Sequence, residues 1–182
     1  FGLTAIFAAI YFKADTIILS KTVPAEQVGF YNVAQNFIMA AMIISSAITV
    51  AIFPALAAAY EKNKDEARQI FNKGLAILIL VGLPLGIGTI LISDNLIRLL
   101  FGVAFSQSAI LLALIALKIP IVFATSLIGN SLGAVGFQKK VALISGINCI
   151  FSLTMNFIFI PLYGPKAAAI ITALTEFIGL LQ

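Results

Sequence analysis

The sequence predicts an all-α membrane protein, built as a bundle of about six transmembrane helices. Hydrophobic residues make up 62% of the 182 residues, and only 10% are charged, whereas a soluble domain is about half apolar and about a quarter charged. The mean hydropathy is +1.13. A soluble core cannot hide this much apolar surface, because the exposed area of a folded protein grows steeply with size. The apolar runs are also long and do not alternate, which excludes membrane β-strands.

The charge-free runs place the helices in order. Crossing the hydrocarbon takes roughly 20 apolar residues, and each of five stretches approaches or exceeds that length, while the last stretch begins a sixth span. The uncharged run at 27–60 is so long that we expect one helix that projects beyond the bilayer. The predicted spans are residues 1–20, 29–58, 74–93, 108–134, 141–160 and 167–182.

The basic residues of the connections predict how the bundle is oriented. Cytoplasmic loops of membrane proteins are enriched in Lys and Arg. The second and fourth loops carry six basic residues, and the first, third and fifth carry three. We therefore expect the second and fourth loops to face the cytoplasm, and the polar segment 59–73 to be a cytoplasmic loop. The six are Lys62, Lys64, Arg68, Lys73, Lys139 and Lys140, and the three are Lys21, Arg98 and Lys166.

Prolines and glycines within the spans predict bends and close packing. Proline removes a backbone hydrogen bond and permits a bend, which is expected at Pro54, Pro84 and Pro120. Gly82 and Gly86 form a GxxxG pair, which suits close contact between membrane helices. Bends and small residues fit a bundle that rocks between two states, although packing alone explains them adequately.

Several classes of function lack the residues they need. The sequence has no histidine, a single cysteine (Cys149) and no phosphate-binding GxxxxGK[ST] loop. We therefore expect no enzymatic activity, no cofactor and no metal site. The net charge of +4 is spread over loops rather than gathered in a patch, so no nucleic-acid partner is expected. The chain begins and ends inside apolar runs without an initial Met, so we interpret it as a fragment of a longer protein.

The informative residues are the charges inside spans, because each is costly in hydrocarbon and should face protein or water. Lys13 and Asp15 lie in the first span, Lys118 in the fourth and Glu176 in the sixth. Lys13 and Asp15 are two residues apart, so they point to different sides of the helix. One interpretation is static ion pairing between helices, such as Lys118 with Glu176. The other is a hydrated cavity whose lysines attract an anionic substrate, with Asp15 or Glu176 as a counter-ion or a proton or sodium site.

A band of amides on the second helix has a simpler interpretation. Asn32, Gln35 and Asn36 fall near its predicted outer end. Such residues more often contact interfacial water or hydrogen-bond between helices than form a substrate site. We therefore assign them no functional role from the sequence.

The order of short motifs resembles the second half of oligosaccharide flippases of the Wzx type. These belong to the multidrug/oligosaccharidyl-lipid/polysaccharide exporter superfamily, which includes the MATE and MurJ transporters. The resemblance covers essentially the whole chain, although PKAAA at 165–169 departs from the usual GAA after the last loop. The motifs are DTIILS at 15–20, VGFYNVA at 28–34, FPAL at 53–56, LLFG at 99–102, Phe105, Asn130, Gly136 and IPLYG at 160–164.

The resemblance implies a six-helix half of a transporter with twelve to fourteen helices, whose N-terminal half is missing here. It implies a multi-pass protein of the cytoplasmic membrane that flips a polyprenyl-pyrophosphate sugar for polysaccharide biosynthesis. The partners would be this lipid-linked oligosaccharide and membrane lipids. Related lipid II flippases hold pyrophosphate with cationic side chains, and only Lys13 and Lys118 qualify here by position.

Two rival functions remain open from the sequence. A cation-coupled multidrug exporter of the same superfamily would favour acidic cavity residues, and Asp15 and Glu176 are available. A membrane scaffold without transport activity would not need charges of both signs inside its spans.

Overall fold

The computed structural model describes the backbone of residues 2–182 and the side chains of residues 10, 13–133 and 135–182. Residue 1, where the first predicted span begins, lies outside the described residues. Within residues 2–182 the secondary structure is helical, with short connections and no strand. The helices are α1 (Gly2–Thr22), α2 (Ala25–Lys62), α3 (Lys64–Phe101), the 3-10 turn η1 (Val103–Phe105), α4 (Gln107–Ala116), α5 (Ile119–Ala134), α6 (Gln138–Tyr163) and α7 (Pro165–Leu181).

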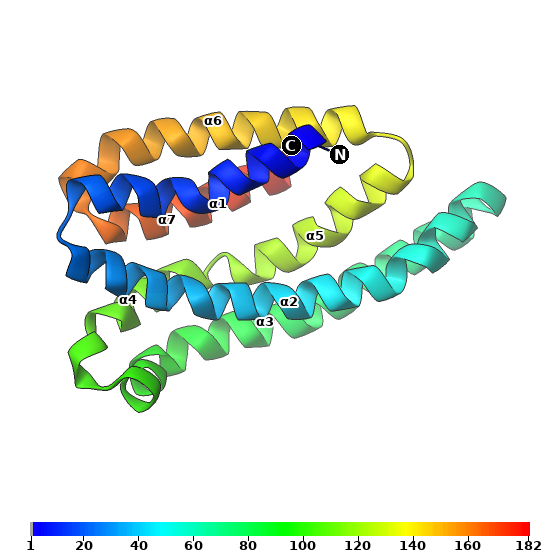
Figure 1. Ribbon diagram of the computed structural model, residues 1–182. Helices are drawn as coiled ribbons and strands as arrows, with labels where there is room; N and C mark the ends of the chain where they lie inside the picture. Colours follow the sequence, from blue (N-terminus) through cyan, green and yellow to red (C-terminus); the bar gives the residue numbers. More distant parts are fainter. Residues whose placement is uncertain (1) are drawn as a thin grey trace.

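The helices form two packed groups that share α7 as a link. Helices α1, α6 and α7 lie together, and α2 and α3 pack with the α4–α5 pair (Figure 1). Helix α7 also contacts α4 and α5, which joins the groups. Counting α4 and α5 as one bent element, the described part of the chain has the predicted six-helix architecture, and the all-α prediction is confirmed.

The region predicted as one span at 108–134 is broken in the middle. Helix α4 ends at Ala116 and α5 begins at Ile119, with a bend of 42° between them. Pro120 stands in the first turn of α5. It has no N–H for the carbonyl of Ala116, so the helical ladder is interrupted at this point. Helices α2 and α3, in contrast, continue through Pro54 and Pro84.

The polar segment 59–73 is helical on both sides of Asn63. Helix α2 continues to Lys62 and α3 starts at Lys64, so Asn63 alone separates them. The Asn63 side chain accepts hydrogen bonds from the backbone N–H groups of Asp65 at 2.9 Å and Glu66 at 3.4 Å. Such an N-cap satisfies donors that the first helical turn leaves unpaired. Helices α2 and α3 thus extend past the other helices as a hairpin (Figure 1).

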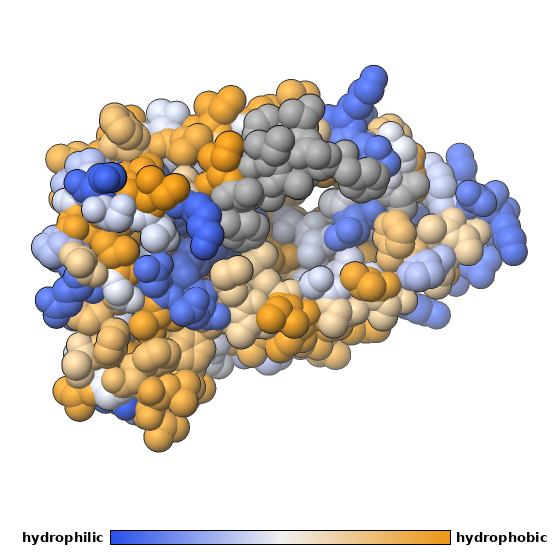
Figure 2. Space-filling view, viewed as in Figure 1, coloured by the Kyte–Doolittle hydropathy of each residue, from blue (hydrophilic) through white to orange (hydrophobic). Residues whose placement is uncertain are grey.

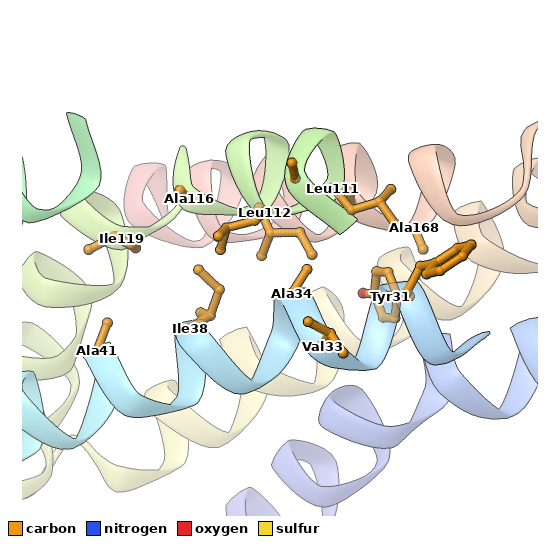
Figure 3. Packing of buried hydrophobic residues seen from close by; sticks show 14 of the residues in the cluster. Tyr31, Val33, Ala34, Ile38, Ala41, Leu111, Leu112, Ala116, Ile119 and Ala168 are labelled. Atoms are coloured by element: carbon orange, nitrogen blue, oxygen red, sulfur yellow. The ribbon is translucent and has the colours of Figure 1, made fainter. Parts of the chain in front are cut away.

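The core lies where α2 meets α4 and the start of α5. Ala34, Ile38 and Ala41 of α2 face Leu112 of α4 and its neighbours, and all are buried (Figure 3). Small residues at these positions allow the backbones to approach closely, as is usual between membrane helices.

The outer surface is apolar, as a membrane protein requires. By length and composition, α2, α3 and α6 can each cross a membrane, and α4 with α5 adds a fourth span if the bent pair is counted as one. Leu91, Leu99 and Phe157 are each more than 70% exposed. In water, exposed apolar surface costs about 25 cal/mol of free energy per Å². Hydrophilic residues gather at the end where α2 and α3 project (Figure 2).

Candidate functional site

Asp15 is a buried carboxylate in the middle of the bundle. Its side chain is on α1 and the residue is 2% exposed. Oδ2 accepts a hydrogen bond from the Tyr31 hydroxyl of α2 at 2.6 Å. It also accepts one at 3.1 Å from Oγ1 of Thr172 of α7, whose single proton is shared with the Ala168 carbonyl at 2.8 Å. Oδ1 is also buried and has no hydrogen-bond partner among the described residues. Because buried polar atoms are nearly always hydrogen-bonded, this oxygen is a candidate acceptor for a ligand atom, an ion or a proton.

Tyr31 connects the carboxylate to a less buried part of the bundle. Its hydroxyl donates to Asp15 and accepts from Nε2 of Gln35 at 3.1 Å. Tyr31 and Gln35 are four residues apart, so they share one face of α2. Tyr31 is fully buried, whereas Gln35 is half-buried. The three side chains form a hydrogen-bonded chain that leads from Asp15 toward the surface of α2.

Lys118 lies at the break between α4 and α5 and is 1% exposed. Its ammonium group is attracted electrostatically by Glu176 of α7 and also by Asp15 of α1. An isolated charge at the bilayer centre costs about 2.5–3.5 kcal/mol on insertion scales, and the attraction of these carboxylates offsets part of such a cost. Irregular backbone at this depth occurs in membrane proteins where it is enclosed by protein or lines a cavity.

Glu176 connects this charged cluster to a cavity. It is half-buried and lines a cavity of about 290 Å³ between α5, α6 and α7. Thr125 of α5 and Ser145 and Asn148 of α6 contribute polar groups to the lining of the same cavity. Thr172 and Glu176 are one helical turn apart, so one face of α7 presents a hydroxyl to Asp15 and a carboxylate to Lys118.

The structure brings three of the four charged candidates together. Asp15, Lys118 and Glu176 form one electrostatic cluster. At about 1.5 Å per residue, Asp15 lies about 10 Å from the end of α1, and Lys118 about 16 Å from the start of α4. Lys13 is exposed on another side of α1 and does not join the cluster. The two-residue spacing from Asp15 explains this, because it turns a helix by about 200°.

Sequence reasoning missed two members of the site and gave a third a different role. Tyr31 and Thr172 are uncharged and common in membrane helices, so their residue types did not single them out. Gln35 was interpreted as an interfacial amide. The available signal is spacing: Tyr31 lies four residues before Gln35, and Thr172 four before Glu176. Both pairs therefore place a hydroxyl one turn from a polar group on a membrane helix.

Solved structures with the same fold are transporters. The chain matches a MATE transporter in its straight conformation with a TM-score of 0.88 and 18% identity, over 98% of this chain and 41% of that one. The lipid II flippase MurJ, in an inward closed conformation, matches with a TM-score of 0.83 and 18% identity, over 98% of this chain and 39% of that one. At this level of identity the likeness establishes the fold, and the predicted six-helix bundle of the MATE-like or MurJ-like type is confirmed.

Curated relatives point to the family. The protein described as "Probable flippase AglR" of Haloferax volcanii is 27% identical over 93% of this chain. The "Probable low-salt glycan biosynthesis flippase Agl15" of the same organism is 25% identical over 91% of it. The chain spans about a third of these relatives, 36% of AglR and 35% of Agl15.

A sequence family described as "Polysaccharide biosynthesis protein" matches residues 1–110, which is more than half of the chain. The match includes Asp15, Tyr31 and Gln35, and ends before Lys118. Together with the fold and the relatives, it confirms the resemblance to Wzx-type flippases that the motifs predict. The chain belongs to the polysaccharide biosynthesis protein family.

Proposed function

We propose that the protein containing this chain flips a lipid-linked oligosaccharide across the cell membrane for polysaccharide biosynthesis. The observation that carries the proposal is Lys118, a fully buried cation at a helix break that is attracted by two carboxylates. Half-helices that meet near the membrane midplane are typical of substrate and ion sites in transporters. The names of AglR and Agl15 support a glycan substrate class.

The physical task is to carry a charged headgroup past the hydrocarbon while the lipid tail stays in the bilayer. A polyprenyl-pyrophosphate sugar has an anionic pyrophosphate that hydrocarbon excludes. We assign Lys118 the role of binding this pyrophosphate. Lys13 lies on the exposed side of α1, away from Lys118, so we assign it a separate contact with the headgroup outside the charged cluster. The proposal involves no bond making or breaking and no cofactor, so the protein is not expected to be an enzyme.

Asp15 and Glu176 are proposed as counter-ions that Lys118 exchanges for the substrate. With ordinary charges, the two carboxylates and the ammonium group sum to −1. Binding of pyrophosphate to Lys118 would release a carboxylate, which could then take up a proton or a sodium ion. Oδ1 of Asp15, which has no hydrogen-bond partner among the described side chains, supports this role. Uptake and release of that cation would couple an ion gradient to the movement of the headgroup.

The proposal also specifies the domain organisation, the membrane and the orientation of the chain. It describes one six-helix transmembrane domain within residues 1–182, of a multi-pass protein in the cytoplasmic membrane. The second six-helix half would belong to the same protein and would close the other side of the cavity. The helical tip at 59–73 would face the cytoplasm, as its basic residues predict.

A cation-coupled multidrug exporter is the second candidate function. Its supporting observation is the net negative charge of the cluster, which favours a cationic ligand over an anionic one. Efflux assays of the full-length protein, with and without a proton or sodium gradient, separate the candidates. Gradient-dependent drug efflux without any effect on glycan assembly would favour the exporter.

Complementation of a flippase-null strain by the full-length protein tests the proposed function. We expect Lys118→Gln and Lys13→Gln to abolish or strongly reduce glycan assembly while membrane expression persists. Lys140→Gln, at an exposed position near the start of α6, is the matched control and should complement normally. If both Lys13→Gln and Lys118→Gln complement fully, the lysine roles are wrong.

A double variant separates transport from folding. Lys118→Gln alone leaves Asp15 and Glu176 without their buried cation, and breaking one partner of a buried charge pair is often strongly destabilising. Lys118→Gln combined with Glu176→Gln removes one charge of each sign. We expect this pair to express well and still fail to complement, since no cation remains at the helix break.

A further inference from the structure

Two neighbouring cavities share one lysine and one tyrosine at the end of the bundle where α6 meets α7. One is an open groove of about 440 Å³ between α6 and α7, and its lining is almost wholly apolar apart from Lys166 and Tyr163. The other is a pocket of about 350 Å³ that reaches α2 and α4 and contains polar side chains. Tyr163 and Lys166 line both. The combination of an apolar groove and a polar pocket matches an amphiphilic ligand.

The polar pocket can donate hydrogen bonds to an anion. Gln27 of α2 and Gln107 of α4 line it together with Lys166. Gln27 also packs against the turn at Gly164, where the position of a Cβ would lie 3.5 Å from its Oε1. Gly164 has a φ of 62° and ends α6, and α7 starts directly after it. Lys166 therefore stands in the first turn of α7, at the positive end of the helix macrodipole, and both charges favour a negative ligand.

The apolar groove can hold a hydrocarbon chain. Phe159 and Tyr163 stack with their ring centroids 6.3 Å apart and form part of its α6 wall. Ile170 and Leu174 form part of the α7 wall and are 46% and 50% exposed. The groove begins beside Lys166 and follows α7 toward its C-terminal end, so a chain in it would run along the membrane-spanning direction.

We propose that this site binds an anionic phospholipid of the membrane. Its phosphodiester lies beside Lys166 and accepts hydrogen bonds from the Gln27 and Gln107 amides, and one acyl chain occupies the groove. A single lysine matches the single charge of a phosphodiester better than the multiple charges of a pyrophosphate. The site is separate from the cluster at Asp15, because Ile170 and Leu174 line the groove whereas Thr172 contacts Asp15.

The expected consequence of lipid binding is a more firmly placed α7. Helix α7 carries the groove on one face and Thr172 and Glu176 on another. An acyl chain in the groove fills the space between α6 and α7, which favours the arrangement in which Thr172 donates to Asp15. Occupied and empty states of the groove would therefore differ in the stability of the charged cluster.

Native mass spectrometry of the full-length protein tests the site directly. The protein is reconstituted with dioleoylphosphatidylglycerol or dioleoylphosphatidylcholine, and the lipids retained after detergent extraction are counted. We expect preferential retention of phosphatidylglycerol, and a loss of about fivefold in its affinity with Lys166→Gln, the weight of one lysine at an anionic lipid surface. Lys21→Gln is the matched control, since Lys21 is exposed at the same end of the bundle and lines neither cavity.

A groove-filling variant and a competitor complete the test. Ile170→Trp should expel the acyl chain and lower the retention of phosphatidylglycerol without removing any charge. Equal retention of both phospholipids, or equal losses with Lys166→Gln and Lys21→Gln, would overturn the proposal. Displacement of phosphatidylglycerol by polyprenyl phosphate at equal or lower concentration would also overturn it, because the occupant would then be a carrier lipid.

Discussion

Asp15 depends on hydroxyl groups from two other helices. Tyr31 and Thr172 donate to the same carboxylate oxygen from α2 and α7. Hydrogen bonds to ionised groups are shorter and stronger than those between neutral groups, and the 2.6 Å contact with Tyr31 fits that pattern. At the scale of single residues, the site is a carboxylate whose position is fixed by neighbours that the sequence places far from it.

Tyr31→Phe tests this arrangement with the smallest change. The variant keeps the ring but removes the donor to Asp15 and the acceptor of Gln35. We expect a loss of about 1 kcal/mol in stability, since hydrogen bonds between membrane helices average about 0.6 kcal/mol and reach about 1.7 kcal/mol. We also expect the flipping activity to fall by a larger fraction than the stability does. Thermal unfolding of the purified full-length protein and complementation measure the two effects.

Tyr60→Phe is the matched control for Tyr31→Phe. Tyr60 is on the same helix but is 38% exposed, so the loss of its hydroxyl should leave both measurements unchanged. Equal effects of the two substitutions would show that the Tyr31 hydroxyl has no special role.

At the scale of elements, two glycines of α3 allow the start of α5 to pack closely against it. A Cβ at Gly82 would come within 2.9 Å of Cγ of Phe123, and one at Gly86 within 3.0 Å of Cδ of Pro120. The GxxxG pair therefore lies directly against the start of α5. Close approach at these glycines positions the segment that carries Lys118.

Gly82→Ala should push α5 away from α3. We expect a destabilisation of about 1–3 kcal/mol, the usual result of overpacking, with a lowered melting temperature of the full-length protein. Gly88→Ala is the control on the same helix, because a Cβ at Gly88 would meet nothing within 4 Å. That variant should be neutral or stabilised by up to about 1 kcal/mol through helix propensity.

A second substitution at Phe123 tests whether the clash is the cause. Gly82→Ala combined with Phe123→Leu removes the ring that the new methyl group meets. Recovery of most of the lost stability is expected, beyond what two independent substitutions would give. A double variant that is less stable than Gly82→Ala alone would contradict the packing explanation.

At the scale of the whole molecule, the two ends of the bundle differ in charge. The end formed by the α2–α3 tip and the start of α6 carries most of the basic residues of the connections. Because basic connections stay in the cytoplasm, we expect this end to face inward. The groove and pocket at Lys166 lie at the opposite end, which the same rule places on the outer side.

Cysteine labelling in intact cells measures this orientation. Cys149 is buried and would be replaced by alanine, and single cysteines would be introduced at Lys64 and Lys21. A membrane-impermeant maleimide should label position 21 in intact cells, and position 64 only after the membrane is opened. Labelling of position 64 in intact cells would reverse the assignment.

The fold class was predictable because it depends on composition and on the length of apolar runs. The uncharged run at 27–60 lies within α2, and that at 74–93 within α3. The break at Lys118 was not predicted as a break, although Pro120 was recognised as a site of bending. The missing information is tertiary: Pro54 and Pro84 are accommodated inside continuous helices, and local sequence alone does not distinguish these three prolines.

The sequence by itself determined that this protein is helical, belongs in a membrane and carries four charges inside its apolar runs. Those conclusions follow from the sequence because a chain that spans hydrocarbon must form long apolar helices and can carry few charges. Only the tertiary structure decided which charges meet. Asp15, Lys118 and Glu176 come from helices far apart in the chain, and helix packing sets their proximity. The same packing leaves Lys13 exposed and brings Tyr31 and Thr172 to Asp15, a contact that their four-residue spacing from Gln35 and Glu176 does not reveal.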